Sequence, residues 1–282
     1  MNKRQAYNYG PGKNRKGLSS SDWIGIILGL AAVLAFAGLG YWIYKEKSAK
    51  VQYNATSYCP LSGPFATTVL LIDLTDEISF LQEQKITNFI HSLATASGED
   101  VVQKHDMLAV YLLKESDADT IPTPVVQVCN PGDGQGLNEF TGNPRLANKR
   151  FSDSFVKPID AAIANIVSAQ SANISPIIES IRGISLTAFS KEPHAGHEHR
   201  LIVISDMLQN SPQISHYKHG QKQTKEELQK FSADLSMVSR VDIKVLDRSG
   251  SERLQGKDLV EFWRAYFRVS GTSLTSAERW AK

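Results

Sequence analysis

The segment from Trp23 to Tyr44, WIGIILGLAAVLAFAGLGYWIY, contains no charged side chain over 22 residues. A helix rises about 1.5 Å per residue, so this run is long enough to cross a hydrocarbon core about 30 Å thick. Aromatic residues lie at both of its ends, where amphipathic rings favour the membrane–water interfaces. The run is longer than the apolar core of a cleaved signal peptide, and no A-x-A cleavage pattern follows it. We therefore predict one uncleaved membrane-spanning helix at residues 23–44.

The charges of the chain are distributed unevenly around this helix. Residues 1–50 contain eight Lys/Arg and two Asp/Glu, whereas the other 232 residues contain 23 and 27. Five basic residues precede the apolar run and three follow it, and the more basic flank tends to stay in the cytoplasm. We expect a cytoplasmic N-terminus and an extracytoplasmic body. The mildly acidic body does not have the basic composition of a nucleic-acid binder.

The composition shifts along the chain predict its organisation. Polar residues, Pro and Gly follow the apolar run without periodicity, as in a linker. The predicted segments are a basic N-terminal tail at 1–22, the membrane helix at 23–44, a linker at 45–66, a globular domain at 67–270 and a C-terminal tail at 271–282.

Two pairs of residues allow interactions that the sequence leaves open. Cys59 and Cys129 can form a disulfide in an oxidising compartment or can remain free thiols. Gly25 and Gly29 form a G-x-x-x-G pattern, which lets two membrane helices approach closely and would support self-association. Small residues are also common in membrane helices that do not associate.

The globular part alternates between short apolar runs and segments of helical periodicity. Runs rich in β-branched residues predict buried strands, and a Pro-flanked run is typical of a sheet edge. Strands separated by helices imply right-handed crossovers. We predict an α/β fold, an open and mostly parallel Rossmann-like sheet with helices on both faces. The expected strands lie at 67–73, 107–113, 124–129, 200–205 and 241–246, the expected helices at 79–97, 153–169, 175–189, 224–238 and 257–269, and a long loop at 130–150.

Carboxylates follow two of the predicted strands. Asp73 ends the run LLID, and Asp206 ends the run VISD. Ligands of open parallel sheets bind beyond the carboxyl ends of the strands. Asp73, Thr75 and Glu77 alternate, so an extended loop would point their oxygens to one side, as Mg²⁺ requires. The alternative is a solvated acidic turn in which Asp76 and Glu77 cap a helix.

These motifs together resemble a von Willebrand factor A domain. The resemblance covers about residues 65–270 and includes the Ser175-Pro-Ile helix start. It implies a metal-ion-dependent adhesion site in which Asp73, Thr75, Ser175 and Asp206 hold Mg²⁺. Glu77 stands where the family pattern has a second Ser, which implies a degenerate site. The loop after Cys129, NPGDG, resembles uncharacterised bacterial proteins of this general type.

The function that follows from the anchor and the resemblance is binding. We predict a membrane-anchored protein–protein interaction module within a membrane-bound assembly, with Mg²⁺ as the cofactor implied by the resemblance and with no catalytic residue. The alternative is a metal-dependent hydrolase, a phosphatase or nuclease with a Rossmann-like core, in which carboxylates hold a metal that activates water. A third reading is a structural brace with an inactive site. No G-x-S-x-G elbow and no P-loop is present in the sequence.

Overall fold

The computed structural model describes residues 20–48, 51–96, 100–137, 142–166 and 172–281. The basic N-terminal residues that predict the orientation of the chain lie outside the described residues. The chain divides into two compact units, residues 1–51 and 52–282.

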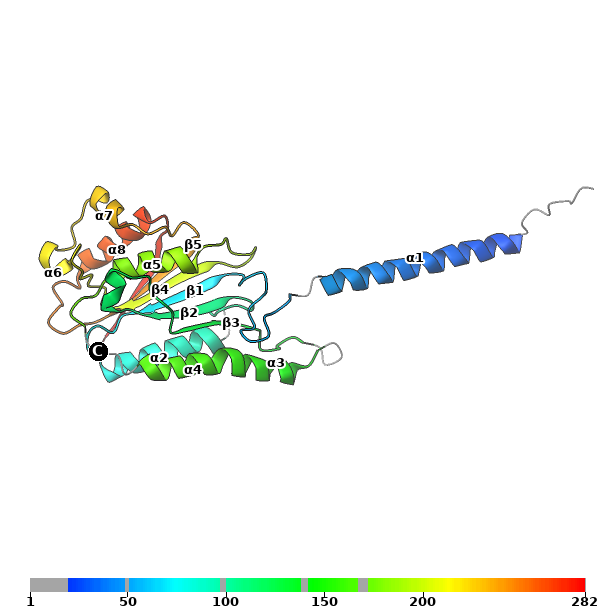
Figure 1. Cartoon of the computed structure of the whole chain (residues 1–282), viewed down its shortest axis with the longest axis horizontal. Helices are drawn as coiled ribbons and strands as arrows, with labels where there is room; N and C mark the ends of the chain where they lie inside the picture. The colour runs from blue at the N-terminus through cyan, green and yellow to red at the C-terminus, as the bar shows by residue number, and fades with distance from the viewer. Residues whose placement is uncertain (1–19, 49–50, 97–99, 138–141, 167–171, 282) are drawn as a thin grey trace, which may run out of the picture. The chain divides into compact units, whose positions relative to one another are not determined.

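The first unit contains one described helix, α1, from Ser20 to Ser48 (Figure 1). Its part from Trp23 to Trp42 is exposed throughout and is long and apolar enough to cross a membrane. A Cβ added at Gly25 or Gly29 would meet no atom from outside the helix backbone within 4 Å, so another backbone could approach these positions. The predicted apolar helix is therefore confirmed as a helix, whereas its insertion and self-association remain predictions.

The second unit is built around a six-stranded sheet in the order β3-β2-β1-β4-β5-β6 (Figure 1). Neighbouring strands are parallel except for the antiparallel pair β2–β3. The predicted edge position of the Pro-flanked strand is thus confirmed. The strands are β1 (Thr67–Ile72), β2 (Met107–Leu112), β3 (Val126–Cys129), β4 (His199–Ser205), β5 (Val238–Leu246) and β6 (Leu274–Trp280).

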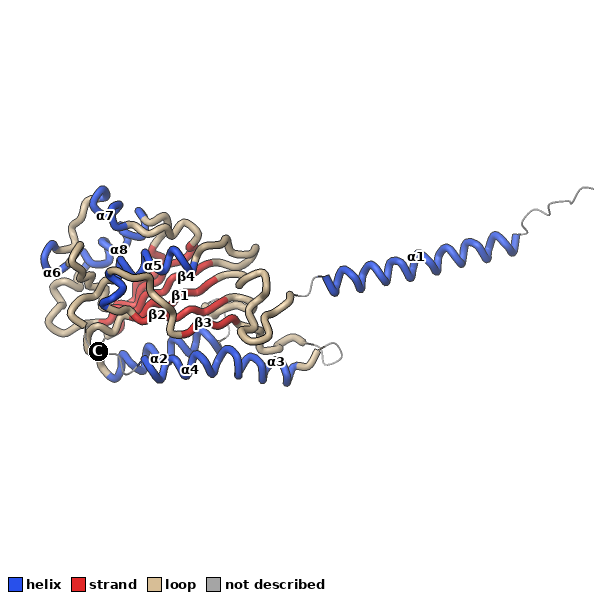
Figure 2. The backbone as a smooth tube through the Cα atoms, viewed as in Figure 1, coloured by secondary structure: helices blue, strands red, loops and turns tan. Residues whose placement is uncertain are grey.

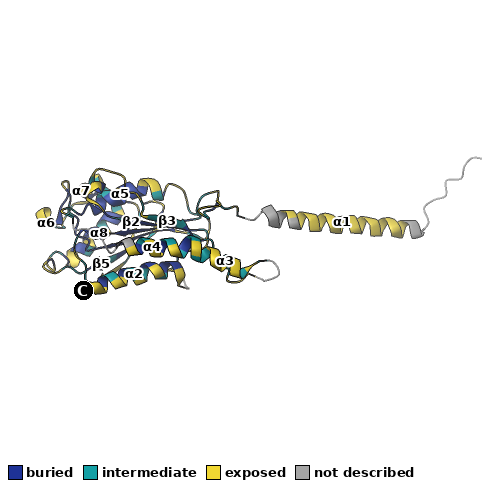
Figure 3. Ribbon diagram, turned by 60° about the horizontal axis from the view of Figure 1, so that its bottom comes forward, coloured by how far each residue is buried: buried dark blue, intermediate teal, exposed yellow. Residues whose placement is uncertain are grey.

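Helices cover both faces of this sheet (Figure 2). In β1, Val69 and Leu71 belong to the core formed with α5 and α8, whereas Leu70 and Ile72 face the core formed with α2 and α4. Burial of every β1 residue is the mark of a central parallel strand. The exposed sides of the helices face solvent (Figure 3), and the predicted α/β class is confirmed. The helices are α2 (Phe80–Thr95), α3 (Pro144–Phe151), α4 (Lys157–Ile166), α5 (Ile177–Ala188), α6 (His216–His219), α7 (Lys225–Phe231) and α8 (Lys257–Val269), with a 3₁₀ turn at Glu115–Ala118 and a π turn at Ser152–Val156.

Three segments differ from the expectation. The predicted helix at 224–238 is α7, which ends at Phe231, and Val238 already begins β5. The predicted C-terminal tail at 271–282 contains β6, which pairs with β5 and buries Trp280. Because β6 lies at the sheet edge, most of its side chains are polar or exposed, and it lacks the apolar run of a central strand. The predicted loop at 130–150 contains α3, which starts at Pro144 after the N-cap Asn143. None of the α3 residues is buried, so the helix has no apolar stripe to reveal it.

The predicted linker is partly folded onto the domain. A disulfide joins Cys59 to Cys129 with a Cα–Cα distance of 5.0 Å, which resolves the alternative left open by the sequence. Tyr53 and Pro60 form an antiparallel bridge beside it. The segment after residue 51 is therefore fastened to the edge strand β3.

Candidate functional site

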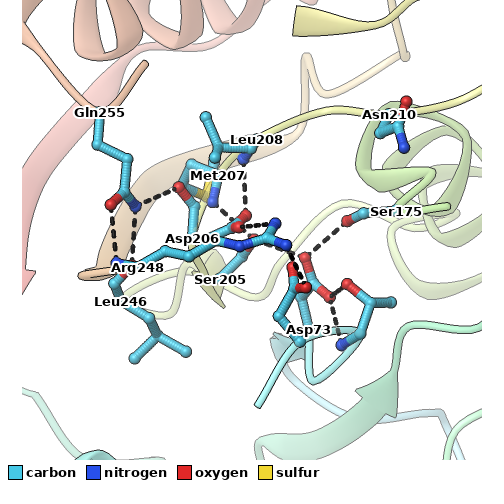
Figure 4. A network of polar contacts seen from close by, with 12 residues as sticks. Asp73, Ser175, Ser205, Asp206, Met207, Leu208, Asn210, Leu246, Arg248 and Gln255 are labelled. Carbon is cyan, nitrogen blue, oxygen red and sulfur yellow. Dashed lines mark hydrogen bonds and ion pairs between the residues drawn. The ribbon is translucent and has the colours of Figure 1, made fainter. Parts of the chain in front are cut away.

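Asp73 is the centre of a buried polar network at the carboxyl ends of β1 and β4 (Figure 4). These two strands are neighbours where the strand order reverses, the position at which open α/β sheets bind ligands. The Oδ1 atom of Asp73 accepts hydrogen bonds from the Thr75 amide at 3.0 Å and the Thr75 hydroxyl at 2.7 Å. Its Oδ2 atom accepts bonds from the hydroxyls of Ser175 and Ser205, both at 2.7 Å. Four donors therefore hold the carboxylate in one orientation.

Ser175 reaches Asp73 because its backbone is paired. Its amide donates to the Asn210 carbonyl at 2.8 Å, and the Asn210 amide donates back at 2.9 Å. The neighbouring Gln209 is fully buried, and its side-chain oxygen accepts the Ile178 amide at the start of α5. This bond satisfies a donor that the helix start would otherwise leave unpaired. The loop after β4 thus positions the segment that carries Ser175.

Asp206 follows β4 directly and is buried. Its Oδ1 accepts the Leu208 amide at 2.8 Å, and its Oδ2 lies 3.2 Å from Nη1 of Arg248. Burial raises the pKa of Asp206 to about 7, and the negative charge of Asp73 contributes to the same direction. Asp206 is therefore an acid that titrates near neutrality.

The backbone of Met207 turns the chain sharply after Asp206. Its φ is +62°, in the left-handed region that costs a non-glycine residue about 1 kcal/mol or more. Two hydrogen bonds stabilise this turn. The Met207 amide donates to the Ser205 hydroxyl at 2.8 Å, and the indole N–H of the buried Trp263 donates to the Met207 carbonyl at 2.9 Å.

A cation from the next strand completes the network. Arg248 lies two residues after the end of β5. Its Nη2 is 2.5 Å from Oδ1 of Asp76, and its Nη1 donates to the Tyr217 hydroxyl at 2.7 Å in addition to Asp206. Burial raises the pKa of Asp76, and the positive charge of Arg248 opposes this rise. One guanidinium therefore joins two acidic side chains and a phenol.

The network borders two cavities. The smaller one, about 20 Å³, has room for about one water molecule and is lined by residues that include Asp73, Asp206 and Glu77. The larger one has a volume of about 240 Å³. The polar residues of its lining are Thr75, Asp76, Asn173, Ser175, Asn210, Tyr217 and Arg248.

The structure brings together most of the residues predicted as a site. Thr75 and Ser175 bond directly to Asp73, and Asp206 adjoins them through its neighbour Ser205. Glu77 is exposed on the rim, and no bond joins it to the other four among the described residues.

The helix-capping alternative is not what the structure shows. Ser79, not Asp76 or Glu77, caps α2, and its hydroxyl and the Gln82 side chain form a capping box. Asp76 instead pairs with Arg248.

The sequence interpretation missed Arg248, Ser205 and Tyr217. Arg248 follows β5 much as Asp206 follows β4, so the rule that identified the aspartates also applied to it. The predicted Mg²⁺ site required only oxygen ligands, so a cation at the same sheet edge was not part of the prediction.

The present arrangement does not fit a divalent cation. Within the described part of the chain, no group of three or more His, Cys, Asp or Glu side chains is arranged to hold a metal. Both oxygens of Asp73 already face hydroxyl or amide donors, and the guanidinium of Arg248 links Asp76 to Asp206. Mg²⁺ needs several oxygens directed at one point, and these oxygens are directed at hydrogen-bond donors.

Comparison with known proteins gives fold-level similarities only. The chain matches no protein-family model and no curated protein sequence. An aerotolerance-related membrane protein from Bacteroides fragilis is similar at 11% identity and a TM-score of 0.33, over 76% of this chain and 91% of that chain. The conserved hypothetical protein BatB from Bacteroides thetaiotaomicron is similar at 10% identity and a TM-score of 0.39, over 77% and 91%. The human COPII-coat protein Sec24c is similar at 10% identity and a TM-score of 0.36, over 82% of this chain and 31% of that chain.

Proposed function

We propose that this chain is a membrane-anchored protein–protein interaction module that works within a membrane-bound assembly. The observation that carries the proposal is the 240 Å³ polar cavity, which lies over a pre-ordered network at the switch point of the sheet. Helix α1 would supply the anchor. The resemblance of the sequence motifs to the von Willebrand factor A domain supports the same kind of role.

The size and lining of the cavity favour a protein partner over a small substrate. Typical small-molecule pockets measure about 300–1,000 Å³, so this cavity suits one inserted side chain. Tyr217 is 45% exposed beside Arg248, and tyrosine and arginine are enriched among the residues that dominate protein interfaces.

The alternative, a metal-dependent hydrolase, has less support. Such an enzyme needs an open coordination position at which a metal activates water. Asp73 accepts four hydrogen bonds, and Asp206 and Asp76 pair with Arg248. The carboxylates of this network are therefore already engaged with hydrogen-bond donors or with Arg248.

The disulfide supports the orientation that the flanking charges predict. Disulfides persist in oxidising compartments, so the Cys59–Cys129 bond favours an extracytoplasmic body. In the same proposal, Gly25 and Gly29 of α1 offer a contact for a second anchor helix.

Site-specific photocrosslinking in native membranes tests the proposal. A photoreactive phenylalanine analogue replaces Tyr217 at the cavity, and in a matched control it replaces Leu146 of α3, which is 52% exposed. We expect a discrete protein adduct from position 217 and none of that size from position 146. No adduct from 217, or the same adducts from both positions, would contradict the proposal. Turnover of phosphoesters with Mn²⁺ that is lost in Asp73→Asn would favour the hydrolase.

A further inference from the structure

We propose that Arg248 takes the place of a divalent cation at this site, so that the site is complete without metal. The inference deepens the proposed function, on which it rests for the role of the cavity. It states which group holds the acidic side chains beside the cavity together and implies that partner binding does not need a divalent cation.

The guanidinium of Arg248 lies between two carboxylates of the network. It contacts Asp76 at 2.5 Å and Asp206 at 3.2 Å. Asp76 and Arg248 both line the larger cavity, and Asp206 lines the smaller one. Two neighbouring carboxylates repel each other unless a positive charge lies between them. Here the charge comes from the chain itself.

Hydrogen bonds hold Arg248 in place from two sides. Its amide donates to Oε1 of Gln255 at 2.8 Å. The Nε2 of Gln255 in turn donates to the carbonyls of Asp206 and Leu246, at 3.0 and 2.8 Å. The buried Gln255 therefore ties the backbone before Arg248 to the end of β4, and the Tyr217 hydroxyl fixes the guanidinium from the other side.

A surface ion pair of the same chain shows the contrast. Arg264 contacts Glu261 at 2.8 Å, but both side chains are about half exposed and three residues apart on one helix. Such pairs contribute little to stability and position nothing. The Arg248 side chain is only 33% exposed, joins three segments distant in sequence, and pairs with an Asp206 that is almost fully buried.

Arg248 and a divalent cation would compete for the same carboxylates. A divalent cation could enter only if the guanidinium left, and this would leave a partly buried charge without its partners. Mg²⁺ also gives up its water ligands reluctantly and needs near-octahedral geometry. Arg248 therefore excludes cations that the aspartates alone would attract.

Metal titration of the full-length chain in detergent micelles tests the proposal. We expect wild type to show no Mn²⁺ binding by electron paramagnetic resonance and the same melting temperature in Mg²⁺ and in EDTA. Arg248→Ala should bind Mn²⁺. Its melting temperature should then rise by about 5–10 °C at a hundredfold excess over the dissociation constant. The gain should vanish in Arg248→Ala/Asp206→Asn, and Arg264→Ala should behave as wild type.

Two results overturn the proposal. One is Mn²⁺ or Mg²⁺ binding by wild type that is lost in Asp73→Asn. The other is an Arg248→Ala chain that keeps its circular dichroism spectrum and still binds no metal. If Arg248→Ala does not fold, Arg248→Met keeps the packing of the side-chain stem and can be compared with wild type for metal binding instead. The first of the two results needs only the wild-type titration and its Asp73→Asn control.

The crosslink separates this proposal from the proposed function. If Arg248 is the resident cation, the adduct from position 217 forms equally well in EDTA. An adduct that EDTA abolishes overturns the role of Arg248 but leaves an interaction module. If no adduct forms in any buffer, the proposed interaction function is wrong. The metal titration then still tests whether Arg248 takes the place of a divalent cation.

Discussion

Replacement of Asp206 by Asn should make the domain more stable at neutral and alkaline pH. Burial raises the pKa of Asp206 from its usual 3.8 to about 7. The unfolded chain therefore loses this proton near pH 4, whereas the folded chain keeps it until about pH 7. A carboxyl group of this kind stabilises the fold fully below pH 4, and its contribution is lost as the pH rises through 7.

The magnitude follows from the size of the shift. Each pKa unit corresponds to about 1.4 kcal/mol, so a shift of about three units costs about 4 kcal/mol once Asp206 is ionised. Asn is neutral and can still accept the Leu208 amide. Arg248 keeps its contacts with Asp76 and Tyr217. We expect Asp206→Asn to match wild type near pH 4 and to exceed its free energy of unfolding by a few kcal/mol at pH 8.

Urea denaturation of the full-length chain across pH 4–8 measures this difference. Trp263 is a suitable fluorescent probe because its indole bonds to the residue after Asp206. Asp119→Asn, which removes an exposed carboxylate, is the matched control and should leave the shape of the pH profile unchanged. If Asp206→Asn is less stable than wild type at pH 8, or keeps the wild-type pH profile, the reasoning about this buried acid is wrong.

The remaining predictions concern stability outside the site. The Cys59–Cys129 bond closes a loop across a sequence separation of 70 residues and so restricts the unfolded chain. Without it, Cys59→Ala/Cys129→Ala should have a free energy of unfolding that is lower by about 4 kcal/mol. Reduced wild type should denature at the same urea concentration as this variant, and a difference of under about 1 kcal/mol from oxidised wild type would refute the estimate. A Cβ on Gly183 would lie 2.4 Å from Cδ of Pro122, so Gly183→Ala should cost about 1–3 kcal/mol despite its better helix propensity. If Gly183→Ala has the urea midpoint of wild type, the loop around Pro122 can move away from the added methyl group at no cost in stability.

The central strands could be predicted from the sequence because burial on both faces leaves an uninterrupted apolar run. The run before Asp73 forms β1, and the run before Asp206 forms β4. The two carboxylates could therefore be placed at one sheet edge before the structure was known. Strand β6 could not be predicted in this way. Leu274–Trp280 forms the edge of the sheet beside β5, and most of its side chains are exposed or only partly buried, so it has no continuous apolar run.

The chemistry of the site could be predicted only in part. Acidic residues at strand ends indicate a place where positive charge is needed, but the pattern does not say what supplies that charge. The sheet-edge rule also places Arg248 just after a predicted strand, but only the strand order shows that β5 lies beside β4 and brings Arg248 to Asp206. The contact between Cys59 and Cys129 was likewise hidden, because it depends on how the segment before β1 folds back to the edge strand.

The disulfide also determines where a mechanical load would enter the fold. Tension on a membrane anchor travels along the chain and meets Cys59 eight residues before β1 begins. The covalent bond passes part of that tension directly to the end of β3, the edge strand that is hydrogen-bonded to β2. The load is therefore divided between two strands, and β1 is not the first element to be peeled from the sheet. The strand that precedes Asp73 would in this way be shielded from movements of a membrane tether.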